Sequence, residues 1–434
     1  MAIPSKMKLI PALVLGLFAN YASASGFQLI EQNASGLGNA YAGSAAIADN
    51  ASTIFYNPAG MTQLQDREFS TGLSAVGTSF KFTDRGSSVG QFNGTGNGGD
   101  GGGWGFIPNA YMSWALNKDL YVGVGMGAPF GMKTEYSTPW VGAAQATMFD
   151  VKTYNINPSI AYRVNDKVSV GAGLSWQRLT ADYHRQAGVA GPVVGGVVTT
   201  VLANSPLKLD LQDDSWGWNV GALFTVSPDT KIGVSYRSTV SYDLTGAINV
   251  SGPSAAVNAG ASSGAKGSLK LPDIFILSAT HQLNNKWQLL GDVSWTGWST
   301  IPKIDIIRTS GALSGQNAQT LDTEFRDAWR VAVGANYQYS SDVKLKFGVA
   351  YDQTPVKSAA YRLVSLPDNN RLWLSTGAQW TPSKGSVFDF GVTYLYLKDS
   401  QINNNQSGAL NRGTVTGDYA ASAWILGVQY SHAF

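Results

Sequence analysis

The stretch WILGVQYSHAF, residues 424–434, decides the fold of this chain. Every second residue from Trp424 to Tyr430 is large and apolar, and the run ends on the aromatic Phe434. Alternation with a period of two indicates a strand with one apolar face. Lipid offers no hydrogen-bond partners, so a strand whose apolar face meets lipid must be paired on both edges. The stretch therefore predicts the closing strand of a transmembrane β-barrel.

The same alternation recurs along the chain, most clearly in residues 168–176, 329–339 and 388–396. Six short connections rich in Asn, Asp, Ser and Pro alternate with seven long ones that are polar or rich in Gly. The long connections cover residues 83–103, 135–151, 182–215, 250–268, 305–326, 352–370 and 399–418. Short turns that alternate with long external loops are typical of outer-membrane barrels. We therefore expect an all-β transmembrane barrel of about fourteen antiparallel strands.

The N-terminus predicts export. Lys6 and Lys8 precede a short apolar run, and Ala22-Ser23-Ala24 follows it as a cleavage site. This order is typical of a secretory signal peptide, so residues 1–24 are expected to be removed. Together with the barrel pattern, it predicts a multi-pass protein of the bacterial outer membrane, surrounded by membrane lipid and lipopolysaccharide. We expect a monomer whose terminal Phe434 is recognised by the barrel assembly machinery.

The composition excludes several classes of protein. Charged residues make up 13% of the chain, whereas soluble domains carry about 25%. The chain has no cysteine, so disulfides and thiolate metal sites are impossible. The formal net charge of +2 argues against nucleic acid as a partner. The three histidines, His184, His281 and His432, lack metal-ligand spacing, and no serine nucleophile motif is present. The sequence predicts no catalytic residue, no metal site and no cofactor.

Residues 25–67 do not fit the alternating pattern. They are rich in Gly, Ala, Asn and Ser, yet carry too many apolar residues for a disordered segment. A fourteen-stranded barrel encloses more space than its own side chains fill. We therefore expect residues 25–67 to fold inside the lumen as a plug (a hatch) and residues 68–434 to form the barrel. The alternative is a tail in the periplasm.

Several motifs resemble the FadL family of outer-membrane transporters. They are Ser25–Leu29 (SGFQL), Ser35–Gly43 (SGLGNAYAG), Ala48-Asp49, Tyr56–Gly60 (YNPAG), Phe325–Arg330 (FRDAWR) and Leu366-Pro367-Asp368. The resemblance covers the whole predicted mature chain. It implies a fourteen-stranded barrel with an N-terminal hatch. It also implies transport of long-chain fatty acids, although part of this family carries monoaromatic hydrocarbons.

The resemblance also implies a route and its residues. Substrate enters a groove in the external loops, binds in a pocket below, and leaves sideways into the bilayer through a kink in the third strand. The implied residues are Arg185 and Arg326 for a ligand carboxylate, Phe27, Asn57, Pro58 and Ala59 for the hatch, and Gly125, Gly127 and Pro129 for the lateral gap. Proline removes a ladder donor and glycine leaves space. Alternatively, Pro129 only marks the end of the strand.

Two further predictions follow from the residues themselves. Charged side chains at inward positions are expected to pair with one another and with the plug; they are Arg237, Asp243, Asp292, Arg326, Arg330, Lys346 and Asp389. The loops at 182–215 and 250–268 are unusually apolar for external loops. We expect a hydrophobic groove there, or a lid formed by the two loops, that includes Val194, Val198, Val201, Leu202 and Val257.

The main functional hypothesis is passive transport of hydrophobic compounds, with long-chain fatty acids as the preferred substrate. An uptake channel for monoaromatic hydrocarbons is the alternative, and a general porin for polar solutes is a weaker one, since a porin lumen has no long apolar plug. An outer-membrane enzyme or an adhesin would also tolerate exposed loops, but no residue pattern favours either.

Overall fold

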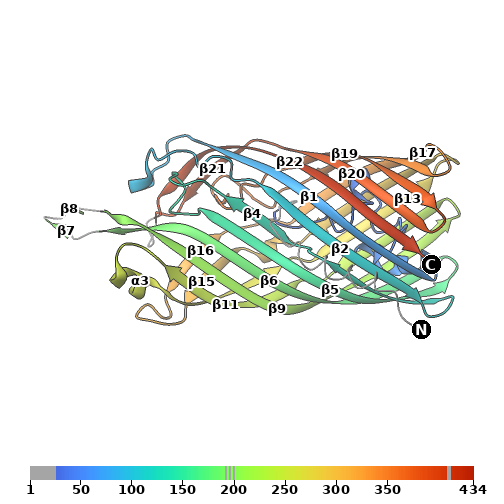
Figure 1. Cartoon of the computed structure of the whole chain (residues 1–434), viewed down its shortest axis with the longest axis horizontal. Coiled ribbons are helices and arrows are strands. Elements are labelled where there is room, and N and C mark those ends of the chain that lie inside the picture. Colours follow the sequence, from blue (N-terminus) through green and yellow to red (C-terminus); the bar gives the residue numbers. More distant parts are fainter. Residues whose placement is uncertain (1–25, 191–192, 195–196, 199–200, 408–411) are drawn as a thin grey trace, which may run out of the picture.

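The computed structural model describes residues 26–190, 193–194, 197–198, 201–407 and 412–434. These residues form one closed antiparallel barrel (Figure 1). The strands are β1 Arg67–Asp84, β2 Trp104–Ala115, β3 Leu120–Gly127, β4 Gly131–Glu135, β5 Met148–Asn165, β6 Val168–Ala190, β7 Val193–Val194, β8 Val197–Val198, β9 Val201–Ser227, β10 Thr230–Arg237, β11 Val240–Val250, β12 Ser263–Leu271, β13 Ile274–Gln282, β14 Trp287–Thr296, β15 Lys303–Arg308, β16 Asn317–Asp322, β17 Ala328–Gln338, β18 Val343–Asp352, β19 Arg371–Ser383, β20 Ser386–Leu397, β21 Ser400–Asn405 and β22 Thr414–Ala433. The predicted signal peptide lies outside the described residues.

Six of the wall strands are interrupted and appear as pairs of shorter strands. The pairs are β3 with β4, β10 with β11, β12 with β13, β14 with β15, β16 with β17, and β20 with β21. When each pair is counted as one strand, the described residues form a barrel of fourteen strands. The barrel closes where β1 pairs with β22, from Glu68↔Ala433 to Asp84↔Gly417. The predicted fold and the predicted closing strand are confirmed.

The outer wall is apolar and the inner wall is largely polar. In β22, Trp424 is 51% exposed on the outside, whereas Gln429 is 1% exposed on the inside. Leu174, Val331, Val349 and Phe390 project outward from other strands in the same way. This distribution is the reverse of that in a soluble barrel and suits a wall surrounded by lipid.

Several details of the predicted wall are wrong. Strands occupy parts of the predicted loops at 250–268, 305–326 and 399–418, namely parts of β12, β15, β16, β21 and β22. Most of the predicted loop at 182–215 is strand, because β6 runs to Ala190 and β9 begins at Val201. There the apolar residues face inward, as Tyr183 and Leu209 do, and the outward residues are polar. Polar outward residues are expected where the wall is surrounded by water. The outward face therefore lacks the apolar alternation that identifies a lipid-facing strand in the sequence. Asp243 faces outward, because the irregularity between β10 and β11 shifts the alternation by one residue.

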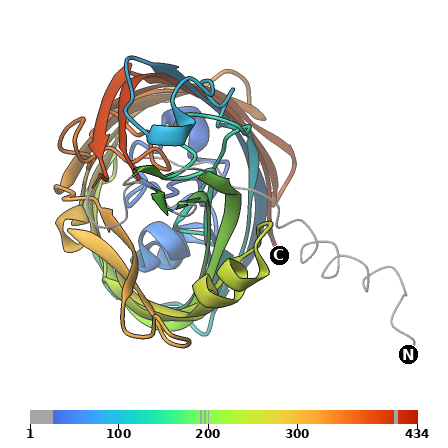
Figure 2. The same cartoon turned by 90° about the vertical axis from the view of Figure 1, so that its left-hand side faces the viewer.

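The N-terminal residues 26–66 lie inside the barrel (Figure 2). They contain a 3-10 helix at Leu37–Asn39, helix α2 at Thr53–Tyr56 and a 3-10 helix at Pro58–Gln63. Leu37 and Ile54 have no exposed surface, which confirms a plug and rules out the periplasmic tail. None of the described helices is long and apolar enough to cross a membrane.

The remaining helices lie outside the plug. They are a 3-10 helix at Gly90–Phe92, helix α3 at Ala255–Ala261 and a 3-10 helix at Trp298–Thr300. The end of the barrel that carries α3 and the hairpin of β7 and β8 is called the loop end (Figure 1). The opposite end, where the C-terminus lies, is called the turn end.

Candidate functional site: a break in the wall beneath the plug

The wall is broken between β3 and β4. Strand β5 pairs with β3 up to Gly127 and with β4 from Gly131, so the wall continues beyond the interruption. The break (residues 128–130) contains Pro129, which has no amide donor for a ladder. Within the described residues, β2 pairs with β3 only from Ala110 to Ala115, and its residues 104–109 have no ladder partner on the side of β4. The break therefore lies within the wall and not at its rim.

A segment of the plug, here called the arm (residues 27–32), covers the break from inside. The Leu29 amide donates to the Pro129 carbonyl at 2.8 Å, and the Gly131 amide donates to the Phe27 carbonyl at 2.8 Å. The side chain of Gln32 donates to the Ala128 carbonyl at 2.8 Å and accepts from the Ala128 amide at 3.1 Å. The arm thus supplies, from the plug, hydrogen bonds that a neighbouring strand would otherwise make.

The predicted glycines make room for this contact. A Cβ on Gly127 would lie 2.3 Å from Oε1 of Gln32, and a Cβ on Gly125 would lie 2.7 Å from the ring of Tyr111. A larger residue at Gly127 would push the plug away from the wall. One at Gly125 would press on Tyr111 of β2 and on Ile54 of the plug, whose Cγ2 lies 3.3 Å from the added Cβ. Gly125, Gly127 and Pro129 are therefore gathered where the plug meets the break.

Four buried aromatic residues form a cluster beside the arm. The ring of Phe27 lies 4.9 Å from that of Trp298 and 6.0 Å from that of Phe130, and Trp298 lies 5.8 Å from Phe325. Edge-on contacts at these distances stabilise aromatic packing. From the sequence, a role in the site could be predicted only for Phe27, and Phe325 is named only as part of the FRDAWR motif. The alternation pattern shows which face a residue occupies but not which distant residue it contacts, so Trp298 and Phe325 were missed.

The Asn57-Pro58-Ala59 motif lies against β6 and β9. Asn57 is fully buried and donates to the carbonyls of Ala45 at 2.7 Å and Ala222 at 2.9 Å. Its Oδ1 accepts from the Ala59 amide at 3.1 Å. The motif is close to the wall because Gly171 of β6 lacks a side chain: a Cβ there would lie 2.4 Å from the Ala59 nitrogen. The motif thus fixes the plug to the wall at this point.

Replacing Gly171 with valine should loosen this part of the plug. The clash involves backbone atoms that cannot rotate away, so we expect a loss of about 1–3 kcal/mol in the free energy of unfolding and faster proteolysis of the plug. Gly291→Val is the matched control, since a Cβ at Gly291 meets nothing within 4 Å. Equal behaviour of the two variants in thermal unfolding and limited proteolysis would contradict this role of Gly171.

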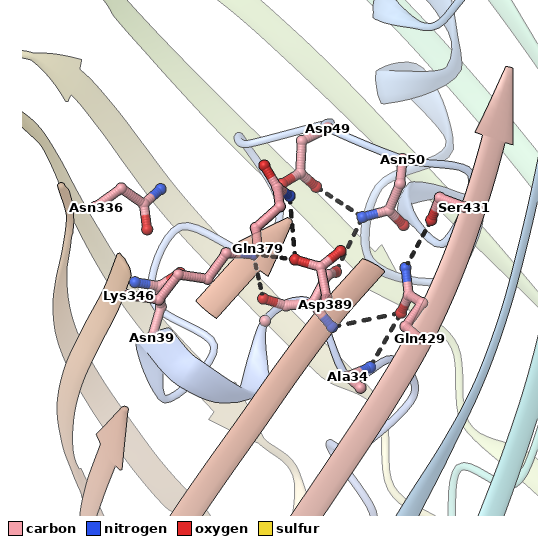
Figure 3. A network of polar contacts seen from close by, with 12 residues as sticks. Ala34, Asn39, Asp49, Asn50, Asn336, Lys346, Gln379, Asp389, Gln429 and Ser431 are labelled. Carbon is pink, nitrogen blue, oxygen red and sulfur yellow. Dashed lines mark hydrogen bonds and ion pairs between the residues drawn. The ribbon is translucent and has the colours of Figure 1, made fainter. Parts of the chain in front are cut away.

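Charged and polar side chains fix the plug to the opposite wall (Figure 3). Lys346 Nζ lies 2.8 Å from Asp389 Oδ1 and donates to the Ser35 carbonyl of the plug at 2.8 Å. Gln379 donates to the same carboxylate at 3.0 Å. Gln429 accepts from the Ala34 amide of the plug at 3.0 Å. The predicted inward charges Arg237, Asp292 and Arg330 also contact the plug, through Phe55, Ser44 and Ala40.

The two predicted carboxylate ligands are not brought into contact. Arg185 points inward from β6 and is 9% exposed. Burial, followed by the positive charges of Arg412 and Arg308, lowers the pKa of Arg185 to about 9, and Tyr183 acts in the opposite direction. Arg326 lies between β16 and β17, where its Nε donates to the Thr354 carbonyl at 3.3 Å. The charged groups around Arg185 are thus two other arginines.

The structure describes the backbone of the predicted loop groove but not its side chains. For Val194, Val198, Val201, Leu202 and Val257 only the backbone is described: β7 pairs with β8, Val201 and Leu202 begin β9, and Val257 lies in α3. In the part of the chain that the structure covers, no group of three or more His, Asp and Glu residues could hold a metal ion.

The fold and the plugged, interrupted wall define the class: an outer-membrane β-barrel with an N-terminal hatch. The chain belongs to the outer membrane protein transport protein family (OMPP1/FadL/TodX), whose model matches residues 15–434. This family comprises transporters of fatty acids or aromatic hydrocarbons, and the protein is a β-barrel of the bacterial outer membrane.

Named relatives match over almost their full length. The chain is 29% identical to the long-chain fatty acid transport protein of Escherichia coli O6:H1, with 98% of this chain and 97% of the relative covered. It is 32% identical to outer membrane protein P1 of Haemophilus influenzae Rd, with 98% of each covered.

Solved structures share the fold. A Pseudomonas aeruginosa FadL homologue has a TM-score of 0.85 at 22% identity, covering 94% of this chain and 99% of that one. The Ralstonia pickettii toluene transporter TbuX has a TM-score of 0.68 at 19% identity, covering 94% and 100%.

Proposed function

We propose that this protein carries long-chain fatty acids passively across the outer membrane and releases them sideways into the bilayer. Substrate enters from a groove at the loop end, binds in an apolar pocket, displaces the arm, and leaves between β2 and β4. The observation that carries this proposal is that the break in the wall is covered by the plug and not by a strand. Unpaired backbone next to lipid is costly, so a cover that can move suits a gate.

A comparison of the free energy of the arm's hydrogen bonds with that of burying methylene groups favours a long acyl chain as the substrate. The arm is held by four described hydrogen bonds across the break, each contributing about 1 kcal/mol net. A buried methylene contributes about 0.8 kcal/mol, so about five methylenes offset the loss of these bonds. A fatty acid of sixteen or so carbons exceeds this several-fold, and therefore no energy source is required.

The polar end of the substrate would meet basic side chains. Arg185 and Arg326 are the residues that we propose for the carboxylate, and the relatives named as long-chain fatty acid transport proteins support the same substrate class. The toluene transporter shares only the fold at 19% identity, so monoaromatic hydrocarbons remain the second candidate.

Competition binding tests the substrate class. On purified protein, oleate should displace a fluorescent fatty acid, and Arg185→Ala with Arg326→Ala should weaken this displacement about ten-fold, as expected for losing a charge-assisted contact. Arg178→Ala, on the outward face of the same strand, is the control. Displacement by toluene alone would make this a hydrocarbon channel. Absence of probe binding, with ion conductance like that of a porin, would overturn the proposal.

A further inference from the structure

Three buried arginines lie near one another inside the loop end, and among the described residues none of them forms an ion pair with a carboxylate. Arg185, Arg308 and Arg412 are 9%, 8% and 3% exposed. We call them the arginine cluster. They lie beyond the membrane-spanning part of the wall, since the lipid-facing residues of β6 end near Trp176 and polar residues such as Arg178 and Asp182 follow on the outer face.

The described contacts connect the elements that carry the cluster. Tyr183, two residues before Arg185 on the same inward face, accepts from Gln319 Nε2 at 3.3 Å. The neighbouring Ala318 carbonyl accepts from Arg412 at 2.9 Å. Arg308 lies in β15, which pairs with β16, where Ala318 and Gln319 lie. In agreement with this geometry, the charges of Arg412 and Arg308 both lower the pKa of Arg185.

The cluster is poorly neutralised for such a buried group. Arg412 donates to the carbonyl of Ala318 and to the side chain of Gln406, and Arg308 donates to the carbonyl of Ala261. Nε of Arg185 and Nε of Arg412 are buried without any hydrogen-bond partner. Among the described residues no carboxylate pairs with any of the three, and the segments outside that description contain no Asp or Glu. Buried charges are normally paired.

The surroundings of the cluster are apolar. Ile306 lies two residues before Arg308 on the same face, and Leu207 pairs with Arg185 across the ladder. Both belong to the buried core, together with Ala318 and Leu321. A ligand for this place therefore needs an anionic end and an apolar body.

We propose that Arg185, Arg308 and Arg412 form one anion site, and that it binds an amphiphile with a doubly charged head group, a phosphate monoester, more tightly than a fatty acid of equal chain length. One carboxylate neutralises one of three cations, whereas a phosphate dianion neutralises two and offers three terminal oxygens to guanidinium forks. The inference rests on the proposed function, because it names the head group of the amphiphile that the barrel would carry.

The test compares dodecyl phosphate, dodecanoate and dodecanol as competitors of a fluorescent fatty acid, with the protein in nanodiscs. At pH 8 dodecyl phosphate should displace the probe at about ten-fold lower concentration than dodecanoate. At pH 5.5 this advantage should largely disappear, since the second proton of a phosphate monoester binds near pH 6, whereas most of the carboxylate stays ionised.

Variants assign the effect to the cluster. Arg308→Gln and Arg412→Gln should each remove most of the advantage of dodecyl phosphate, and Arg412→Lys should keep part of it because the charge stays and the planar fork is lost. The outward Arg178→Gln should leave it unchanged. A heat-dependent shift in gel mobility confirms that each variant is folded.

The outcomes separate the two proposals. Equal displacement by dodecyl phosphate and dodecanoate at pH 8, or an advantage that survives both Arg308→Gln and Arg412→Gln, would overturn the arginine cluster as a phosphate site and leave fatty-acid transport standing. Failure of all three amphiphiles to displace the probe would instead contradict the proposed function itself.

Discussion

Oxidation of a Gln28→Cys/Phe130→Cys variant is expected to stop fatty-acid uptake, and reduction is expected to restore it. Gln28 and Phe130 face each other in an isolated antiparallel bridge between the arm and the break. The hydrogen bonds of this bridge lie on either side of the pair, from Leu29 to Pro129 and from Gly131 to Phe27. Such a non-hydrogen-bonded pair brings the Cα atoms to about 4.5 Å, which lies within the range for a disulfide.

The expected effect is large because a disulfide holds the arm on the break covalently. Uptake of labelled oleate by cells without other carriers should then fall to the background of cells that lack the protein. The natural chain has no cysteine, so each single-cysteine variant serves as a control for the loss of the native side chain. If the oxidised double variant transported oleate as fast as the reduced one, exit through the break would be excluded.

Asp389→Asn should cause the largest loss of stability of any single polar substitution proposed for this protein. Lys346 and Asp389 are 1% and 2% exposed at the side chain and lie 2.8 Å apart. Removing one partner leaves an uncompensated buried charge, which costs about 3–5 kcal/mol. Because Lys346 also holds the Ser35 carbonyl of the plug, ion conductance through the lumen should rise as the plug loosens. Denaturant unfolding and planar-bilayer conductance measure the two effects.

Two controls separate the buried pair from charge in general. Asp305→Asn removes the partly exposed partner of Lys303, whose own side chain is 60% exposed, and should cost less than about 1 kcal/mol. The double variant Lys346→Met/Asp389→Leu removes both charges and should recover most of the stability, since apolar replacement of a buried pair is often close to neutral. A single Asp389→Asn variant as stable as Asp305→Asn would show that the pair does not hold the plug.

The sequence predicted those features that depend on period and composition. Alternation revealed the wall wherever lipid faces it, and the apolar content of residues 25–67 revealed the plug. The same rule failed in β6 and β9 beyond the membrane, because water outside the wall reverses the expected faces there. It failed at Asp243 because the interruption between β10 and β11 shifts the inward–outward alternation by one residue.

The candidate site was predictable only in part, for a related reason. Pro129 and its glycines mark an interruption locally, since proline and glycine act on their own backbone. That the arm covers the interruption depends on contacts between residues about one hundred positions apart, such as Gln32 and Ala128. The neighbours of Arg185 come from β15 and from the segment before β22, and no local pattern indicates that these elements meet.

The barrel wall can close only when β1 pairs with β22, the first and the last strand of the chain. We therefore expect closure to be a late step of folding. Ser70 and Ser431 meet across this pair of strands although 361 positions separate them, and closing so long a loop costs entropy before its contacts form. Until then both bordering strands expose unpaired edges that lipid cannot satisfy. A chain that loses β22 is therefore not a slightly narrower channel. It is a sheet with two open edges, prone to aggregate.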